Sequence, residues 1–451
     1  MLNLRMSYIG LGVLICTIAG CGKPQQVEVK EVSVSNSASQ PEVAAPAVKA
    51  SDWAGWRGPH GDGTAPDQSI PLAWDDPKNI VWKVAVPGRG HADPTVVENM
   101  VVLATADEQA QVQSVVALNR QDGSQLWKVD LHQGNLEAQV HNKNTQATST
   151  IAYDGERLFA TFLNDKKIWI TALNLKGEKL WSTNVGGFTS KFGYSASPTI
   201  YKSLVIIAAD NHGGGYLAAL NRETGDVVWL KERPAKATYA SPIVFQIGGK
   251  DQLVIAGCDQ IVSFDPNTGE QFWAVDGTTE ACVGTVVRHG ELVYASGGYP
   301  GSETVCIDAS GKVVWRNTEK SYVPSLLQYN GYLYVVEDGG VATCLDAKTG
   351  DKKWQQRIGG NFSASPILVG SNLIAIDEAG KATVFEANPE KFVRVAEHQM
   401  GDEAFATPVA CGNRLYLRVA QQVEGVRQEY LYCIGAPEVA ANESTAETTA
   451  K

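Results

Sequence analysis

The chain has 451 residues, and its acidic side chains outnumber its basic ones. Lys and Arg total 38 against 49 Asp and Glu, which gives a formal net charge of -11. An acidic chain without a cluster of basic residues is a poor ligand for nucleic acid and for an anionic lipid surface, so binding to either by charge is excluded. A hydrophobic content of 44% is enough for a large buried core.

The first twenty residues have the features of a secretion signal. Arg5 precedes an apolar stretch that ends in Ala19-Gly20-Cys21 and is too short to span a bilayer comfortably. Small residues directly before a cysteine resemble the processing signal of bacterial lipoproteins, which implies cleavage after residue 20 and lipidation of Cys21. Gly22 follows, and the resemblance then implies an outer-membrane lipoprotein facing the periplasm. An ordinary signal peptide or a signal anchor is the alternative.

Three further segments lie outside the repeated part of the chain. Residues 21–51 are rich in Gln, Glu, Ser, Ala and Pro without apolar periodicity, which predicts a disordered tether, and residues 436–451 predict a disordered tail for the same reason. Residues 52–78 contain Trp53-Ala-Gly-Trp-Arg-Gly-Pro59 and are interpreted as an N-terminal arm that packs onto the domain. We expect this arm to lie outside the main fold, so that its removal leaves folding almost intact.

Six copies of one pattern fill the central part of the chain. In each copy an apolar strand runs into a polar turn with a glycine, and a second strand ends in tryptophan, as in ALNRETGDVVW, which ends at Trp229. A hairpin loop of this kind places its glycine at positive φ. Successive tryptophans are 39 to 54 residues apart, a period typical of repeat architectures. The six are Trp127, Trp181, Trp229, Trp273, Trp315 and Trp354.

A second pair of strands precedes each tryptophan hairpin. In one unit these are residues 240–245 and 252–256, both rich in β-branched residues. Four strands in a unit of this length are typical of the blade of a β-propeller. Counting the first strands gives eight units, which begin near Asp93, Thr150, Ser197, Ser241, Gly284, Val323, Ser365 and Thr407.

The eighth unit stops after its third strand, at residues 430–434. Residues 79–86 have the pattern of a tryptophan strand, with Trp82, but no unit in front of them. Pairing these two ends closes the ring and removes open sheet edges that would otherwise aggregate. The sequence therefore predicts an all-β protein, an eight-bladed β-propeller of four-stranded antiparallel blades over residues 79–435, closed by an N-terminal strand.

Six cysteines remain after Cys21. Cys306, Cys344 and Cys433 occupy the small position about ten residues before the tryptophan, where other units have alanine. We interpret them as packing residues. Cys258 with Cys282, or Cys411 with Cys433, could form a disulfide in an oxidising compartment, and the spacing leaves this open.

The repeated pattern resembles the tryptophan-docking motif of the pyrroloquinoline quinone (PQQ) repeat. That resemblance implies that each tryptophan packs between blades against a small residue and the glycine of a turn. The same eight-bladed design is shared by PQQ-dependent alcohol dehydrogenases and by BamB-type lipoproteins of outer-membrane protein assembly, which are not enzymes. The blade-docking residues are then Trp82, Trp127, Trp181, Trp229, Trp273, Trp315 and Trp354.

The resemblance to the dehydrogenases implies a set of residues that can be sought in this chain. Their cofactor lies over a tryptophan and under a disulfide between adjacent cysteines, with a carboxylate, an asparagine and a catalytic aspartate around calcium. This sequence has no adjacent cysteines and no acidic cluster with recognisable calcium spacing. We therefore expect no catalytic residue, cofactor or metal.

The function predicted from the sequence is that of a non-catalytic, lipid-anchored binding or scaffold protein of the cell envelope. It is BamB-like, monomeric, has protein partners in outer-membrane protein assembly, and does not bind nucleic acid. The alternative is a PQQ-dependent dehydrogenase that oxidises alcohols or sugars.

Polar residues in two regions are the candidates for binding a partner or ligand, since loops and strand ends of a rigid scaffold carry such residues. His141, Lys143 and Asn144 lie in residues 131–149, the longest departure from the repeat. The second group lies at strand ends in units two to four and consists of Lys191, Tyr194, Asp210, Arg233 and Tyr239.

Overall fold

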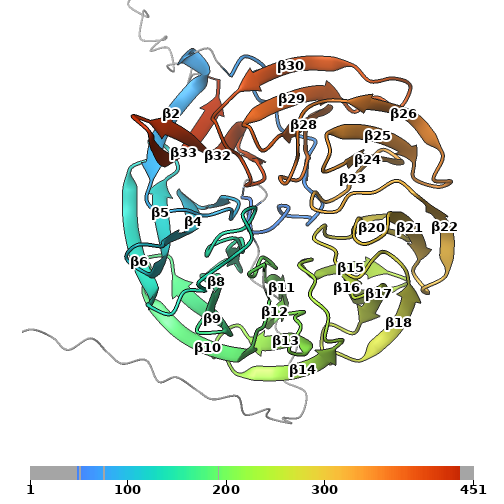
Figure 1. Cartoon of the computed structure of the whole chain (residues 1–451), viewed down its shortest axis with the longest axis horizontal. Helices are drawn as coiled ribbons and strands as arrows, with labels where there is room; N and C mark the ends of the chain where they lie inside the picture. The colour runs from blue at the N-terminus through green and yellow to red at the C-terminus, as the bar shows by residue number, and fades with distance from the viewer. Residues whose placement is uncertain (1–47, 50–51, 75–76, 191, 437–451) are drawn as a thin grey trace, which may run out of the picture.

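The computed structural model describes residues 48–49, 52–74, 77–190 and 192–436. It confirms an eight-bladed β-propeller whose blades surround a central axis (Figure 1). The predicted signal peptide, the lipidation site Cys21, most of the tether and nearly all of the tail lie outside the described residues. No helix in the part of the chain that the structure describes is long and apolar enough to cross a bilayer.

Each blade is an antiparallel sheet in which strands follow one another from the axis outward. Blades 1 to 4 comprise β3 (Thr95–Val97), β4 (Met100–Asp107), β5 (Val112–Asn119) and β6 (Gln125–Gln133); β7 (Ala152–Tyr153), β8 (Arg157–Asn164), β9 (Lys167–Asn174) and β10 (Lys179–Gly187); β11 (Thr199–Tyr201), β12 (Leu204–Ala208), β13 (Gly215–Asn221) and β14 (Val227–Arg233); and β15 (Ile243–Ile247), β16 (Lys250–Gly257), β17 (Gln260–Phe264) and β18 (Gln271–Asp276).

The remaining blades have the same order, and the last is completed by the N-terminal strand. Blades 5 to 8 comprise β19 (Val287–His289), β20 (Leu292–Gly297), β21 (Glu303–Asp308) and β22 (Val313–Asn317); β23 (Leu327–Tyr329), β24 (Tyr332–Val336), β25 (Val341–Asp346) and β26 (Lys352–Arg357); β27 (Ile367–Val369), β28 (Asn372–Ile376), β29 (Lys381–Glu386) and β30 (Arg394–Gln399); and β31 (Val409–Cys411), β32 (Arg414–Val423), β33 (Val426–Gly435) and β2 (Ile80–Val86).

Burial explains why the inner and outer strands have different sequences. The second and third strands of a blade are covered on both faces by neighbouring blades, so β12 and β13 are buried throughout. The outermost strands face solvent on one side, and β6 accordingly alternates between exposed and half-buried residues. In this fold, a continuous apolar run therefore marks a strand inside the blade, and a run that alternates between apolar and polar residues marks an outermost strand.

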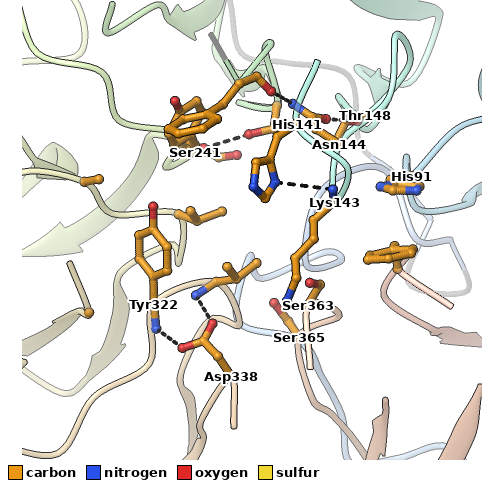
Figure 2. A pocket seen from close by; sticks show the side chains of 18 of the residues that line it. His91, His141, Lys143, Asn144, Thr148, Ser241, Tyr322, Asp338, Ser363 and Ser365 are labelled. Atoms are coloured by element: carbon orange, nitrogen blue, oxygen red, sulfur yellow. Dashed lines mark hydrogen bonds between the residues drawn. The ribbon is translucent and has the colours of Figure 1, made fainter. Parts of the chain in front are cut away.

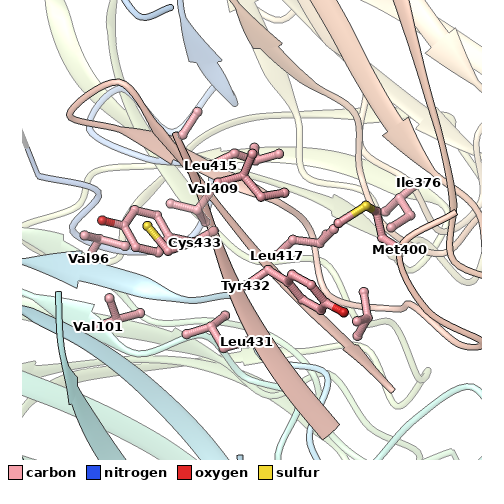
Figure 3. Packing of buried hydrophobic residues seen from close by; sticks show 14 of the residues in the cluster. Val96, Val101, Ile376, Met400, Val409, Leu415, Leu417, Leu431, Tyr432 and Cys433 are labelled. Carbon is pink, nitrogen blue, oxygen red and sulfur yellow. The ribbon is translucent and has the colours of Figure 1, made fainter. Parts of the chain in front are cut away.

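The N-terminal strand closes the ring as predicted. After a short 3₁₀ turn, η1 (Pro77–Asn79), strand β2 pairs antiparallel with β33, with Ile80 opposite Ile434 and Trp82 opposite Cys433. The two ends of the propeller are thus hydrogen-bonded in one sheet, and the apolar core is continuous across the junction. Figure 3 shows side chains of blades 7, 8 and 1 packed in one cluster.

Tryptophan docking joins successive blades. Trp181 lies opposite Ala172 in its own blade and donates from Nε1 to the carbonyl oxygen of Arg222 in the next blade, at 3.1 Å. Gly225 of that blade has φ 75°, and a Cβ there would lie 2.6 Å from the indole of Trp181. Only glycine fits both the turn and the close approach. Equivalent indole-to-carbonyl bonds come from Trp82, Trp127, Trp229, Trp273, Trp315 and Trp354.

The cysteines fill the small positions beside these rings. Cys306 lies opposite Trp315 and Cys344 opposite Trp354, and both thiols are buried. Each of the six cysteines from Cys258 to Cys433 is a free thiol, so neither of the two disulfides left open by the sequence is formed.

The N-terminal arm crosses the axis rather than lying outside the ring, which corrects one expectation from the sequence. Trp53 and Trp74 are fully buried in the core cluster of blades 7, 8 and 1. In Figure 1 the blue N-terminal segment passes across the centre of the ring. The arm contacts five blades. Trp53 bonds to Val96 of blade 1, Ala54 to Tyr153 of blade 2, Trp56 to Thr285 of blade 5 and Arg57 to Leu326 of blade 6. In blade 7, β1 (Thr64–Ala65) pairs parallel with β27.

The arm also supplies a ring where the repeat lacks one. In blade 7 the tryptophan position of β30 is held by Ala396, opposite Val384. Trp74 belongs to the core cluster against which Ala396 packs, and it stacks on His398 of β30 with ring centroids 4.6 Å apart. The arm therefore adds an aromatic ring to blade 7, where the repeat itself lacks the tryptophan.

Candidate functional site

A cavity of about 770 Å³ lies on the propeller axis. Its walls come from the segments that lead into the first strands and from loops between second and third strands. Trp56, in the arm segment that crosses the axis, contributes to the lining and donates from Nε1 to Thr285 Oγ1 of blade 5. Figure 2 shows His141 and Lys143 within the cavity, with His91 on one side of them and Tyr322 on the other.

A circle of blade-to-blade hydrogen bonds surrounds the cavity. At seven of the eight blade junctions, the residue two positions before the first strand donates its backbone N–H to a side-chain oxygen of the next blade. Asp93 closes the circle, because its Oδ1 accepts from Thr407 N at 2.7 Å. The other bonds run from Asp93 to Thr150, Thr150 to Ser197, Ser197 to Ser241, Thr285 to Ser325, Ser325 to Ser365, and Ser365 to Thr407.

Two buried polar side chains line this cavity with an atom that has no protein partner. Asp93 is 3% exposed, and its Oδ2 accepts no hydrogen bond. Burial raises the pKa of Asp93 to about 8, so its carboxyl group is protonated at neutral pH. His91 is 7% exposed with an unpartnered Nε2, and burial, assisted by nearby arginines, holds its pKa well below the usual value.

The charged groups at the cavity wall are mostly satisfied by the protein. Lys143 Nζ lies 2.7 Å from Glu378 Oε1, and Ser363 donates to the same oxygen at 2.6 Å. The carboxylate of Asp338 accepts from the backbone N–H groups of Tyr322 at 3.0 Å and Val323 at 2.8 Å. These bonds fix the wall of the cavity.

Aromatic rings cover much of the remaining wall. Phe192 contacts His141 edge-on at 5.0 Å and Tyr239 at 6.2 Å between ring centroids, and Tyr299 lies 6.3 Å from Tyr322. Burial raises the pKa of Tyr239 to about 12, which keeps its hydroxyl protonated. The cavity thus combines ring faces with neutral hydrogen-bonding groups.

The structure separates the binding residues predicted from the sequence into two groups. His141, Lys143, Asn144 and Tyr239 all line the cavity, and Asn144 donates to the carbonyl oxygen of Phe192 at 2.7 Å. The other described candidates lie elsewhere, and Lys191 is outside the described residues.

Asp210 and Arg233 form a buried ion pair within blade 3. Arg233 Nε and Nη2 donate to the two carboxylate oxygens of Asp210 at 2.6 and 2.9 Å, and both side chains are almost fully buried. The Tyr194 hydroxyl donates to the carbonyl oxygen of Ala208. None of these three residues lines the cavity, so their contacts are those of structural residues.

Sequence reasoning missed Trp56, His91 and Asp93. Asp93 could have been found, because it precedes a proline at the position where other units have Ser-Pro or Thr-Pro, and it is the one carboxylate in that series. Trp56 gave no such signal, since only the path of the arm brings it to the axis.

The residues of the cavity do not fit a PQQ and calcium site. Trp56 offers a ring, but no cysteine lines the cavity, and the Asp338 carboxylate is taken by two backbone donors. Among the residues that the structure describes, no group of three or more His, Cys, Asp or Glu is arranged to hold a metal ion.

These features define the class of the protein: an eight-bladed PQQ-like repeat propeller with an axial cavity lined in part by its own N-terminal arm. The chain belongs to the family described as outer membrane protein assembly factor BamB, whose family model matches residues 111–356 and 258–423, more than half of the chain.

Individual relatives are distant. The BamB of Moranella endobia is 24% identical over 327 residues, which cover 67% of this chain and 78% of that protein. The tetrathionate hydrolase of Acidithiobacillus ferrooxidans is 24% identical over 287 residues, 57% of this chain and only 52% of that protein. Among solved structures, a europium-containing methanol dehydrogenase superposes with a TM-score of 0.65 at 12% identity, covering 85% of this chain and 98% of that one. The structural likeness shows the fold alone.

Proposed function

We propose that this chain is a non-catalytic, lipid-anchored scaffold protein that assists outer-membrane protein assembly from the periplasmic face of the outer membrane. The observation that carries the proposal is the match to the BamB family over more than half of the chain. The partners are proteins of the cell envelope, and the propeller acts as a monomer.

The geometry supports a binding role. Blade-to-blade hydrogen bonds and tryptophan docking make the ring a rigid platform, while the loops above it are free to present side chains. The cavity wall is built from groups that already bond to one another, such as Lys143 with Glu378.

Co-purification tests this function. We expect the lipidated protein, extracted from its own envelope with mild detergent, to carry β-barrel assembly proteins in fixed ratio. A matched sample of free propeller added after extraction controls for chance binding. If the protein is recovered without such partners, and if it reduces a dye with alcohols or sugars only when PQQ and calcium are present, the dehydrogenase is favoured instead.

Replacing Cys21 is expected to move the protein off the membrane. The thiol of Cys21 is the proposed attachment point of the lipid, so Cys21→Ser should abolish acylation and shift most of the protein to the soluble envelope fraction. Fractionation and the mass of the N-terminal peptide check this. Cys306→Ser, at a buried thiol of the ring, is the control and should keep the acyl mass. A wild-type N-terminal peptide without acyl mass would contradict the proposal.

A further inference from the structure

The axial cavity contains buried polar atoms that no protein group satisfies. Oδ2 of Asp93 and Nε2 of His91 both lie at this cavity, in side chains more than nine-tenths buried. A buried polar atom without a partner costs roughly 1–3 kcal/mol, so native proteins normally provide one in the form of water or a ligand. Both atoms are themselves covered, so a polar ligand in the cavity reaches them only when the neighbouring side chains shift.

The charge balance of the lining disfavours an anionic ligand. Lys143 is paired with Glu378, and Asp338 is bonded by backbone N–H groups. Asp93 and His91 are both neutral at pH 7, since burial raises the pKa of the first and lowers that of the second. Glu280 and Lys320 balance each other in sign, which leaves the Asp338 carboxylate as an unbalanced negative charge in the lining.

The hydrogen-bonding groups of the cavity are hydroxyls rather than backbone edges. Ser197, Ser241 and Ser365 each accept a backbone N–H of the preceding blade. A hydroxyl that accepts one bond can still donate its own hydrogen, so the circle offers O–H donors toward the cavity. The same bonds consume the backbone N–H groups that an extended peptide would need for strand pairing.

Aromatic faces complete the pattern. Trp56 lines the cavity with its Nε1 bonded to Thr285 Oγ1 at 2.7 Å, and Tyr322 lies on the wall. Aromatic faces beside hydroxyl and carboxyl donors match a sugar ring, which has an apolar face and polar edges. The volume of about 770 Å³ lies within the range of small-molecule sites, roughly 300–1,000 Å³.

We propose that the axial cavity binds an uncharged saccharide of one or two rings, with a sugar face on Trp56 and sugar hydroxyls bonded to Asp93, His91 and the serine hydroxyls. This site goes beyond the proposed function in outer-membrane protein assembly and does not depend on it. Failure of sugar binding would leave the co-purification result unaffected.

Calorimetry and tryptophan fluorescence on the full mature chain test the proposal. The probes are maltose, cellobiose and N,N′-diacetylchitobiose, and at least one should bind saturably with a Kd of about 1 mM or lower. Trp56→Leu and, on the wall, Tyr322→Ala should each weaken that binding at least about tenfold, since each removes an aromatic face. Tyr332→Ala, in β24 of the same blade but outside the cavity, is the matched control and should change affinity less than about twofold.

Three outcomes would overturn the proposal. One is no saturable binding of any probe up to about 20 mM. Another is equal weakening by Tyr332→Ala and Tyr322→Ala, which would indicate a general structural effect. The third is tighter binding of glucuronic acid, glucosamine or an uncharged peptide of alternating tyrosine and serine than of the three disaccharides. Melting curves of each variant show whether a loss of binding reflects unfolding, and Tyr322→Ala then decides if Trp56→Leu does not fold.

Discussion

Deleting residues 22–87 is expected to open the propeller and make it aggregate. This deletion removes β2, the strand that pairs with β33, and with it Trp82, whose indole is 7% exposed and docks on the next blade. Truncating one buried tryptophan costs about 3–5 kcal/mol, and loss of the strand also exposes two sheet edges. Melting temperature and light scattering measure both effects.

A shorter deletion distinguishes the effect of losing the arm from the effect of losing strand β2. Removing residues 22–78 deletes Trp53 and Trp74 from the core but leaves β2 in place, so we expect a clear loss of stability without edge exposure. Removing residues 22–47 is the control and should not change the melting temperature. If the deletions ending at 78 and at 87 melt and scatter alike, β2 does not close the ring.

Replacing Arg418 with leucine is expected to destabilise the same junction by about 3 kcal/mol, the lower end of the range for breaking a buried ion pair. Arg418 Nη2 lies 2.6 Å from Glu429 Oε2, and both side chains are 2% exposed. Arg418 Nη1 also donates to the carbonyl oxygen of Ala104 in blade 1 at 2.8 Å. The substitution leaves Glu429 buried, with Arg427 as its remaining ionic partner at 3.0 Å.

Chemical denaturation of Arg418→Leu measures this loss. Arg394→Leu breaks a partly exposed pair with Glu397 in blade 7 and is the control, with an expected change of about 0–1 kcal/mol. The double variant Arg418→Leu, Glu429→Leu should recover part of the stability, because it removes the stranded charge. Equal effects of Arg418→Leu and Arg394→Leu would mean that Arg418 does not stabilise the junction of blades 8 and 1.

The fold was predictable because its signals are local and repeated. Turn glycines such as Gly225, the tryptophan positions and a hydroxyl two residues before the first strand recur in most blades, so one unit predicts the next. First strands begin two to four residues after the predicted unit starts, as with Thr95 after Asp93. Closure of the ring by residues 79–86 could be predicted because these residues have the pattern of a tryptophan strand but no unit of their own.

The arm and the cavity were less predictable because their contacts are not local. Trp56 and Thr285 are 229 residues apart, and no pattern near either residue predicts that they meet. Asp210 and Arg233 were predicted to bind a ligand because they are polar residues at strand ends. Residues that contact a ligand and residues that form internal ion pairs both occupy such positions, so the sequence does not distinguish them. His141 and Lys143 could be placed because they interrupt the repeat, and interruptions of a propeller lie in its loops.

The most direct test of the proposed function is the amount of β-barrel proteins in the outer membrane of cells that lack this chain. Quantitative proteomics of outer membranes should show several β-barrel proteins reduced together, with recovery when the wild-type chain is restored and poorer recovery with Cys21→Ser. Unchanged β-barrel protein levels in the deletion strain, under growth conditions in which the wild-type chain is abundant, would contradict a role in outer-membrane protein assembly.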